Sequence, residues 1–242
     1  MLRSFLNTTN QHTMINRQTV AMSTKALTAV LIATLLSKAP LASAAIVVSN
    51  LDETSSSSLI IYDFAIDPDP RDGLNGAQSF TTGSLAATLN SITIKMDTGE
   101  SGGGFSLQLW SNVGGSPGSS LLTLVGDADP ATDGLYTYTA PSFLLTASTT
   151  YWAVGTVPSS GSNGLFHWSE TSSTNDTSSF GWTIGNAAKF RGVTDGVPDA
   201  SWANDTTVAQ MSLDATVVPE PGSAVLLLGG LAALAGFRRR RE

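Results

Sequence analysis

Short runs of β-branched and aromatic residues, separated by clusters of turn-forming residues, fill the chain from Ala45 to Val218. Apolar side chains alternate in several runs, as Phe105, Leu107 and Leu109 do in GFSLQLW, which is typical of a strand with one face on a core. No stretch of this region keeps a helical period over three turns. The pattern predicts an all-β fold, an antiparallel β-sandwich or jelly-roll-like domain. The predicted strands are 57–65, 87–96, 104–110, 120–126, 134–140, 149–157, 164–170 and 208–218, with turns over 98–104, 112–120 and 126–134.

Composition narrows what such a domain can do. The 242-residue chain has no cysteine, which excludes disulfides, thiolate metal sites and cysteine nucleophiles. The region 45–218 carries four basic and seventeen acidic residues, a net charge of −13. Because the phosphate backbone repels a domain of this charge, we expect no nucleic acid partner.

The N-terminal region has the pattern of a secretory signal peptide. Lys25 precedes the apolar run 26–36, and the small-residue triplet Ala42-Ser43-Ala44 follows. The run is too short for a permanent membrane span. We therefore expect signal peptidase to cleave after Ala44, so that residues 1–44 are leader and signal peptide and residues 45–217 form the β-sandwich surface domain.

The C-terminal region 218–242 has the features of a second targeting segment. The apolar run Ala224–Phe237 predicts a short transmembrane helix, interrupted by glycines. The four arginines that follow it would lie on the cytoplasmic side, which agrees with an exported domain. These cytoplasmic anchor residues are Arg238, Arg239, Arg240 and Arg241.

The order of Pro219-Glu220-Pro221, hydrophobic helix and arginine cluster resembles the PEP-CTERM sorting signal of Gram-negative bacteria. The resemblance implies that an exosortase, a membrane-embedded transpeptidase-like enzyme, recognises Pro219, Glu220 and Pro221 and cuts nearby. It further implies transient anchoring in the inner membrane, then residence at the cell surface, in the outer envelope or in the extracellular matrix. Proteins of this kind are associated with exopolysaccharide and biofilms.

The central region resembles the choice-of-anchor R domain over residues 75–157. The most distinctive part is Leu109-Trp110-Ser111 leading into GGSPG at 114–118. The resemblance implies a β-sandwich-like surface domain and assigns it no reaction.

Catalytic residues are scarce in the predicted domain. His167 is its only histidine and therefore the only possible base of a Ser-His-Asp triad, and no serine lies in a G-x-S-x-G motif. Its glutamates are Glu53, Glu100 and Glu170, and its aspartates fall mostly in turns. We expect no enzymatic activity and no catalytic residues; a secreted glycoside hydrolase is the alternative, and it would require two carboxylates that converge in a cleft.

Two aspartate-rich loops are weak candidates for calcium, and otherwise no cofactor is expected. Closely spaced carboxylates beside glycine suit a hard cation, but neither loop has EF-hand spacing and the prolines also suit ordinary turns. The candidate ligands are Asp67, Asp69 and Asp72 in DPDPRDG, and Asp127, Asp129 and Asp133 in DADPATDG.

Aromatic residues crowd the polar second half of the domain. Exposed tryptophans there would stack on sugar rings, and the candidates are Trp168, Trp182 and Trp202. The alternative is that these rings fill the core, with Trp202 the most loop-like of the three. The sequence therefore predicts an exported, non-enzymatic protein with a structural or adhesive role, and leaves open a carbohydrate-binding, lectin-like module for extracellular polysaccharide.

Overall fold

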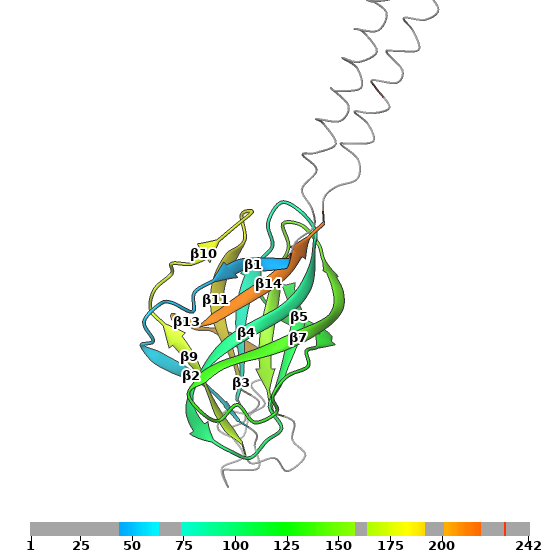
Figure 1. The fold of residues 1–242 in the computed structure, drawn as a ribbon. Coiled ribbons are helices and arrows are strands. Elements are labelled where there is room, and N and C mark those ends of the chain that lie inside the picture. The colour runs from blue at the N-terminus through cyan, green and yellow to red at the C-terminus, as the bar shows by residue number, and fades with distance from the viewer. Residues whose placement is uncertain (1–43, 63–73, 158–163, 192–200, 219–229, 231–242) are drawn as a thin grey trace, which may run out of the picture. The chain divides into compact units, whose positions relative to one another are not determined.

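A computed structural model describes residues 44–62, 74–157, 164–191 and 201–218, together with Gly230. Every described residue belongs to one compact unit, Ala42–Glu242. Within the described ranges, fourteen strands join into one sheet (Figure 1). The strands are β1 (Ala44–Ser49), β2 (Ser57–Tyr62), β3 (Leu74–Thr81), β4 (Ala87–Glu100), β5 (Ser106–Val113), β6 (Ser116–Thr123), β7 (Gly134–Leu145), β8 (Thr150–Thr156), β9 (Leu165–Thr171), β10 (Thr177–Ser178), β11 (Thr183–Arg191), β12 (Ser201–Asn204), β13 (Val208–Ala209) and β14 (Met211–Val217).

The predicted all-β, antiparallel fold is confirmed. The long strand β4 joins the two halves of the sheet, because it lies between β14 and β7 over most of its length and pairs with β9 near its end. One half has the order β10-β1-β14-β4-β7, and the other contains β9-β2-β3-β8-β5-β6, with β11 beside β3 and β12 beside β11. Side chains from both halves meet in one hydrophobic core.

Alternation along β4 carries much of this core. Leu89, Ile92, Ile94 and Met96 are buried, and the three-residue step after Leu89 breaks the period of two. A β-bulge explains the step, because Leu89 pairs with Ala215 of β14 and Ser91 pairs with Asp214, which leaves Asn90 as an extra residue on β4. The extra residue returns the following apolar side chains to the core face.

The β5–β6 turn is shorter than the predicted turn over 112–120. Val113 pairs with Ser116, and Gly114 and Gly115 between them have φ of 62° and 88°. This is a two-residue hairpin turn that needs positive φ at both positions. Pro117 lies inside β6, which is tolerated because β6 is at the edge of the sheet.

The prediction omitted five strands: β1, β3, β10, β11 and β12. The most consequential is β3, which lies inside the sheet between β8 and β11. Its residues Gly76 to Phe80 are all buried and include few large apolar side chains. A Cβ at Gly76 would lie 2.5 Å from Leu59 Cδ2, so neighbouring side chains fill the space that a larger residue would need.

Candidate functional site

The predicted sorting segment begins where the last strand ends. β14 ends at Val217, and the Val218 N–H donates to the Ala86 carbonyl at 2.8 Å. The folded domain therefore continues to the residue before Pro219, without a spacer. Pro219, Glu220, Pro221, the predicted helix and the four arginines lie outside the described residues.

The last residue before the predicted signal cleavage lies beside the final strand. Ala42 is outside the described residues, whereas Ala44 is the first residue of β1 and pairs with Thr216 of β14. Cleavage after Ala44 stays a prediction, and it would leave β1 to begin at Ala45. The strand that opens the exported domain and the strand that closes it are thus neighbours.

Two of the three candidate stacking tryptophans lie in the core. Trp168 and Trp182 are both 0% exposed. The Trp168 Nε1–H donates to the Gln210 carbonyl at 2.8 Å, and the Trp182 ring stacks on Phe80 with centroids 6.1 Å apart. Neither ring has a face open to a ligand, so the interpretation of these two residues as a sugar-binding platform is wrong.

Trp202 instead belongs to an aromatic cluster outside the main core. It lies on β12, with its ring centroid 5.3 Å from that of Phe190 on β11 and 6.1 Å from that of Trp110 on β5. We call Trp110, Phe190 and Trp202 the outer aromatic cluster; all three are partly exposed. A small second core supports Trp110 and Trp202 and consists of Ala77, Trp152, Val154 and Ala188.

Amide side chains accompany the outer aromatic cluster. The Trp110 Nε1–H donates to Gln108 Oε1 at 3.0 Å, and the Trp152 Nε1–H donates to Asn112 Oδ1 at 2.9 Å. Partly exposed rings beside amides combine apolar surface with hydrogen-bonding groups, which is the chemistry that sugar recognition requires. Sequence reasoning missed Trp110 and Phe190, because long-range strand pairing alone brings them to Trp202.

Two aspartates of the 126–134 loop accept hydrogen bonds from this loop and from the neighbouring residues 101–103. Asp129 accepts hydrogen bonds from Ser101 Oγ and from the Gly102 and Gly103 N–H groups, the latter two at 3.2 Å each. These bonds, that from Ser101 first, lower the pKa of Asp129. Asp127 Oδ1 in turn accepts from the Asp129 N–H at 2.9 Å.

No calcium centre is apparent in the part of the chain that the structure describes. Its residues contain no group of three or more His, Cys, Asp or Glu placed to hold a metal ion. That part includes Asp127, Asp129 and Asp133, whereas Asp67, Asp69 and Asp72 lie outside it.

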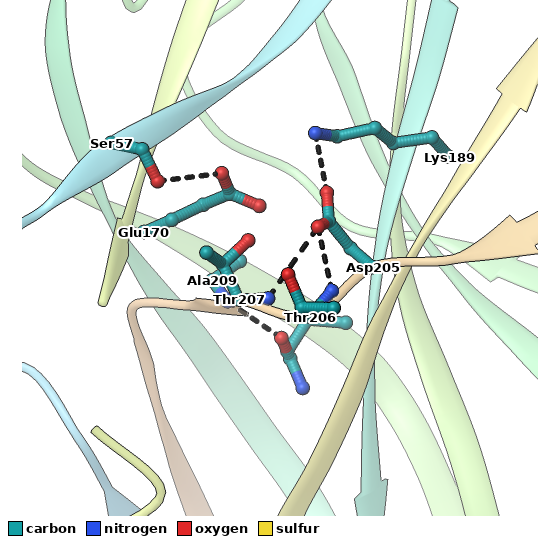
Figure 2. Close-up of polar contacts among 8 residues, drawn as sticks. Ser57, Glu170, Lys189, Asp205, Thr206, Thr207 and Ala209 are labelled. Carbon is teal, nitrogen blue, oxygen red and sulfur yellow. Dashed lines mark hydrogen bonds and ion pairs between the residues drawn. The ribbon is translucent and has the colours of Figure 1, made fainter. Parts of the chain in front are cut away.

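A group of polar side chains lies where β2, β9, β11 and β13 meet (Figure 2). Glu170 is 1% exposed, and its Oε2 accepts from Ser57 Oγ at 3.1 Å. Its Oε1 has no hydrogen-bond partner among the described residues, nor does Thr207 Oγ1. A carboxylate so enclosed is out of reach of a substrate.

An ion pair occupies the other side of this group. Lys189 Nζ contacts Asp205 Oδ2, while Asp205 Oδ1 accepts from the N–H groups of Thr206 at 2.7 Å and Thr207 at 3.4 Å (Figure 2). Burial alone would raise the pKa of Asp205, but the hydrogen bond and charge of Lys189, with the two backbone donors, lower it overall. The pair connects β11 to the chain entering β13 and thus serves the fold.

His167 has the beginning of a triad without its third member. Its Nδ1 lies 3.3 Å from Ser58 Oγ on the neighbouring strand. Asp97 is the register partner of His167 across β4 and β9, yet its Oδ1 accepts from Ser169 Oγ at 2.8 Å. An aspartate used in this way does not orient the imidazole as a catalytic triad requires.

A pocket of about 230 Å³ opens beside β11 and β13, and its lining has no titratable side chain. It therefore offers no side-chain acid or base that could activate a nucleophile such as the Thr174 hydroxyl. The lining residues are Thr174, Asn175, Ile184, Gly185, Asn186 and Val208.

Comparison with known proteins bears on the C-terminal segment. The family model described as the PEP-CTERM protein-sorting motif matches residues 217–241. No curated protein and no solved structure matches the chain. Among the described residues, no helix is long and apolar enough to cross a membrane. The matched motif implies that the chain is exported, sorted by an exosortase and directed to the cell surface.

Proposed function

We propose that this chain is a non-enzymatic component of the cell surface or extracellular matrix, with a structural or adhesive role linked to exopolysaccharide. In this proposal an exosortase releases the β-sandwich domain from a transient anchor in the inner membrane. The observation that carries the proposal is the sorting motif at 217–241, which follows the final strand without a spacer.

The positions of the acidic residues support a role without catalysis. Glu170 is enclosed, Asp129 holds a neighbouring loop and Asp205 is paired with Lys189. A glycoside hydrolase would instead need two accessible carboxylates facing one another across a cleft.

Within the same proposal, residues 75–157 form a choice-of-anchor R-like domain. This range contains six consecutive strands, β3 to β8. The distinctive GGSPG stretch forms the β5–β6 turn and the start of β6. The resemblance thus covers a contiguous part of the sandwich, which agrees with a role in display at the surface.

Processing of the C-terminus tests the proposal directly. The variant Glu220→Ala should block processing, because it alters the centre of the sorting motif. The matched control Glu100→Ala also removes one glutamate, from an exposed position at the end of β4, and should be processed normally. Mass spectrometry of the surface-released protein gives the result. A released wild-type chain that still contains residues 223–237 would overturn the proposal.

A second candidate function is binding of extracellular polysaccharide at the outer aromatic cluster. It is favoured by the three partly exposed rings, by Gln108, which accepts from Trp110, and by Asn112, which accepts from Trp152 of the second core. Titration of the purified chain with the host's exopolysaccharide, with calcium and with chelator, tests it. Trp202→Ala should abolish saturable binding, whereas Phe180→Ala, an exposed aromatic residue outside the cluster, should leave it intact. Absence of binding by the wild type in both conditions would exclude this function.

A further inference from the structure

The two ends of the exported domain lie at one end of the sheet. Ala44 at the start of β1 pairs with Thr216, and Val217 at the end of β14 pairs with Ala87 at the start of β4. Ala87 in turn pairs with Leu145 at the end of β7. Figure 1 shows these four strands converging where β14 ends.

The β10–β11 connection reaches the same end. The Ser148 N–H donates to the Gly83 carbonyl at 2.8 Å, which holds the β3–β4 and β7–β8 connections together. A Cβ at Gly83 would lie 2.0 Å from the Phe180 carbonyl oxygen, so the backbone of Phe180 lies against the β3–β4 connection. We call this surface the exit end, and it consists of residues 44–46, 83–88, 144–149, 179–181 and 216–218.

The exit end carries exposed apolar side chains and few charges. Its five ranges contain no Asp, Glu, Lys, Arg or His, and the acidic residue at its border is Asp214, which pairs with Ile46 and accepts a hydrogen bond from Asn90 Nδ2 at 2.8 Å. Ile46 and Leu144 are each 61% exposed, Phe180 is 59% exposed and Val218 is 37% exposed. Several large exposed apolar side chains at one end of a sheet are typical of a docking site.

The opposite end of β4 is acidic. The 126–134 loop packs there, since the Gly99 N–H donates to the Ala131 carbonyl at 2.8 Å and Asp129 accepts from Gly102 and Gly103. The 14 residues of β4 separate the two ends by roughly 40 Å along the strand. The acidic residues of this end are Asp97, Glu100, Asp127, Asp129 and Asp133.

We infer that the exit end docks on the phospholipid bilayer that receives the chain's own C-terminal segment. This inference rests on the membrane insertion contained in the proposed function. Only six residue steps separate Val218 from Ala224, where the predicted transmembrane helix begins. Six extended residues reach about 20 Å at most, so the tether keeps the exit end close to the lipid headgroups.

The distribution of acidic residues in the domain favours the same orientation, with the exit end toward the membrane. The acidic end of the domain, with five acidic residues, is repelled by anionic lipid headgroups and turns away from them, whereas the exit end, bordered by Asp214 alone, is repelled less. The remaining exposed hydrophobic residues lie outside the exit end, from which the C-terminal segment continues. They are Ile60, Val113, Leu121, Val125 and Leu135.

The absence of cysteine allows a direct test by single-cysteine labelling. The exported chain, purified from cells that lack the exosortase so that its C-terminal segment is retained, is labelled with a fluorophore after Ser84→Cys, Thr98→Cys or Leu228→Cys. Ser84 is exposed at the exit end, Thr98 is exposed at the acidic end and Leu228 lies in the predicted helix. Each labelled chain is reconstituted into vesicles of phosphatidylethanolamine and phosphatidylglycerol that contain nitroxide-labelled lipid.

We expect the nitroxide lipid to quench the labels at positions 84 and 228 but not the label at position 98. Quenching at 228 with equal signals at 84 and 98 would overturn the docking of the exit end and leave the membrane anchor standing. No quenching at 228 would overturn the membrane anchor, and the docking with it.

Matched charge insertions on β7 test the surface itself. Leu144→Glu and Leu135→Glu each add one charge at a side chain that is 61% exposed, the first at the exit end and the second near the acidic end. Leu144→Glu should reduce quenching of the label at Ser84→Cys to the level of the Thr98→Cys label, and Leu135→Glu should not change it. An unchanged signal in both variants would refute docking through the exit end.

Discussion

Replacement of Trp168 by alanine separates a core tryptophan from a ligand-binding one. Trp168 is 0% exposed in the main core, and its Nε1–H donates to the Gln210 carbonyl at 2.8 Å. Truncation of a fully buried tryptophan costs about 3–5 kcal/mol. The carbonyl of Gln210 keeps a second donor, the Lys95 N–H at 3.2 Å, so no buried acceptor is left unpaired. We therefore expect a loss of roughly 4 kcal/mol from the cavity and the hydrogen bond together.

Trp168→Phe measures the contribution of the hydrogen bond to this loss, and Trp202→Ala gives the loss for a partly exposed tryptophan. Phenylalanine keeps most of the ring and loses the hydrogen bond, so Trp168→Phe should cost roughly 1–2 kcal/mol. Trp202 is partly exposed, so folding buries less apolar surface of its side chain than it does for Trp168. Its truncation should therefore cost roughly 1–2 kcal/mol.

Guanidinium unfolding of the segment 44–218, followed by far-ultraviolet circular dichroism, measures the three losses. The midpoint should fall furthest for Trp168→Ala, with the slope unchanged. If Trp168→Ala costs no more than Trp202→Ala, the assignment of Trp168 to the core is refuted.

Three further predictions follow from individual contacts. Since hydrogen bonds lower the pKa of Asp129, its stabilisation of the 101–103 loop is present above the unfolded pKa of about 4 and is lost as pH falls through the folded pKa. The hydrogen-exchange protection factors of that loop, which correct for the slower intrinsic exchange at low pH, should fall in acid in the wild type, and Asp129→Asn should remove this pH dependence. Asp205→Asn should lower the midpoint of guanidinium unfolding at neutral pH, where the pair with Lys189 is intact. Below about pH 4 the substitution should lower the midpoint less, because Asp205 becomes protonated. An equal effect at both pH values would contradict the role of charge. Gly83→Ala should cost roughly 1–3 kcal/mol in thermal unfolding because its Cβ would meet the backbone of Phe180, and an unchanged Tm would contradict this.

Several of the strands that the sequence predicts have one face on the core. In β4, β5 and β7, apolar residues alternate with polar ones, and this local pattern survives whatever the strands pair with. The C-terminal sorting signal is equally local, because its motif, apolar run and arginines are adjacent in the chain. Both features were therefore predictable without knowledge of the tertiary structure.

The strands that the prediction omitted lack this pattern. β3 is buried on both faces, between the main core at Phe80 and the second core at Ala77, so its small and polar residues show no alternation. Its Gln78 finds partners far away, since Gln78 Oε1 accepts from the Ala209 N–H 131 residues along the chain. No local pattern indicates a contact of that range.

The assignment of the tryptophans was decided in the same way. Trp168 and Trp202 both lie in polar, serine-rich sequence, yet one is 0% exposed and the other is partly exposed in the outer aromatic cluster. The difference arises because β9 pairs with β2 and β4 over the main core, whereas β12 pairs only with β11 among the described strands. The sequence by itself determined the antiparallel β class and the sorting signal, whose causes are local. Only the tertiary structure decided which rings, acids and apolar side chains face solvent, because burial depends on strands that are distant in sequence.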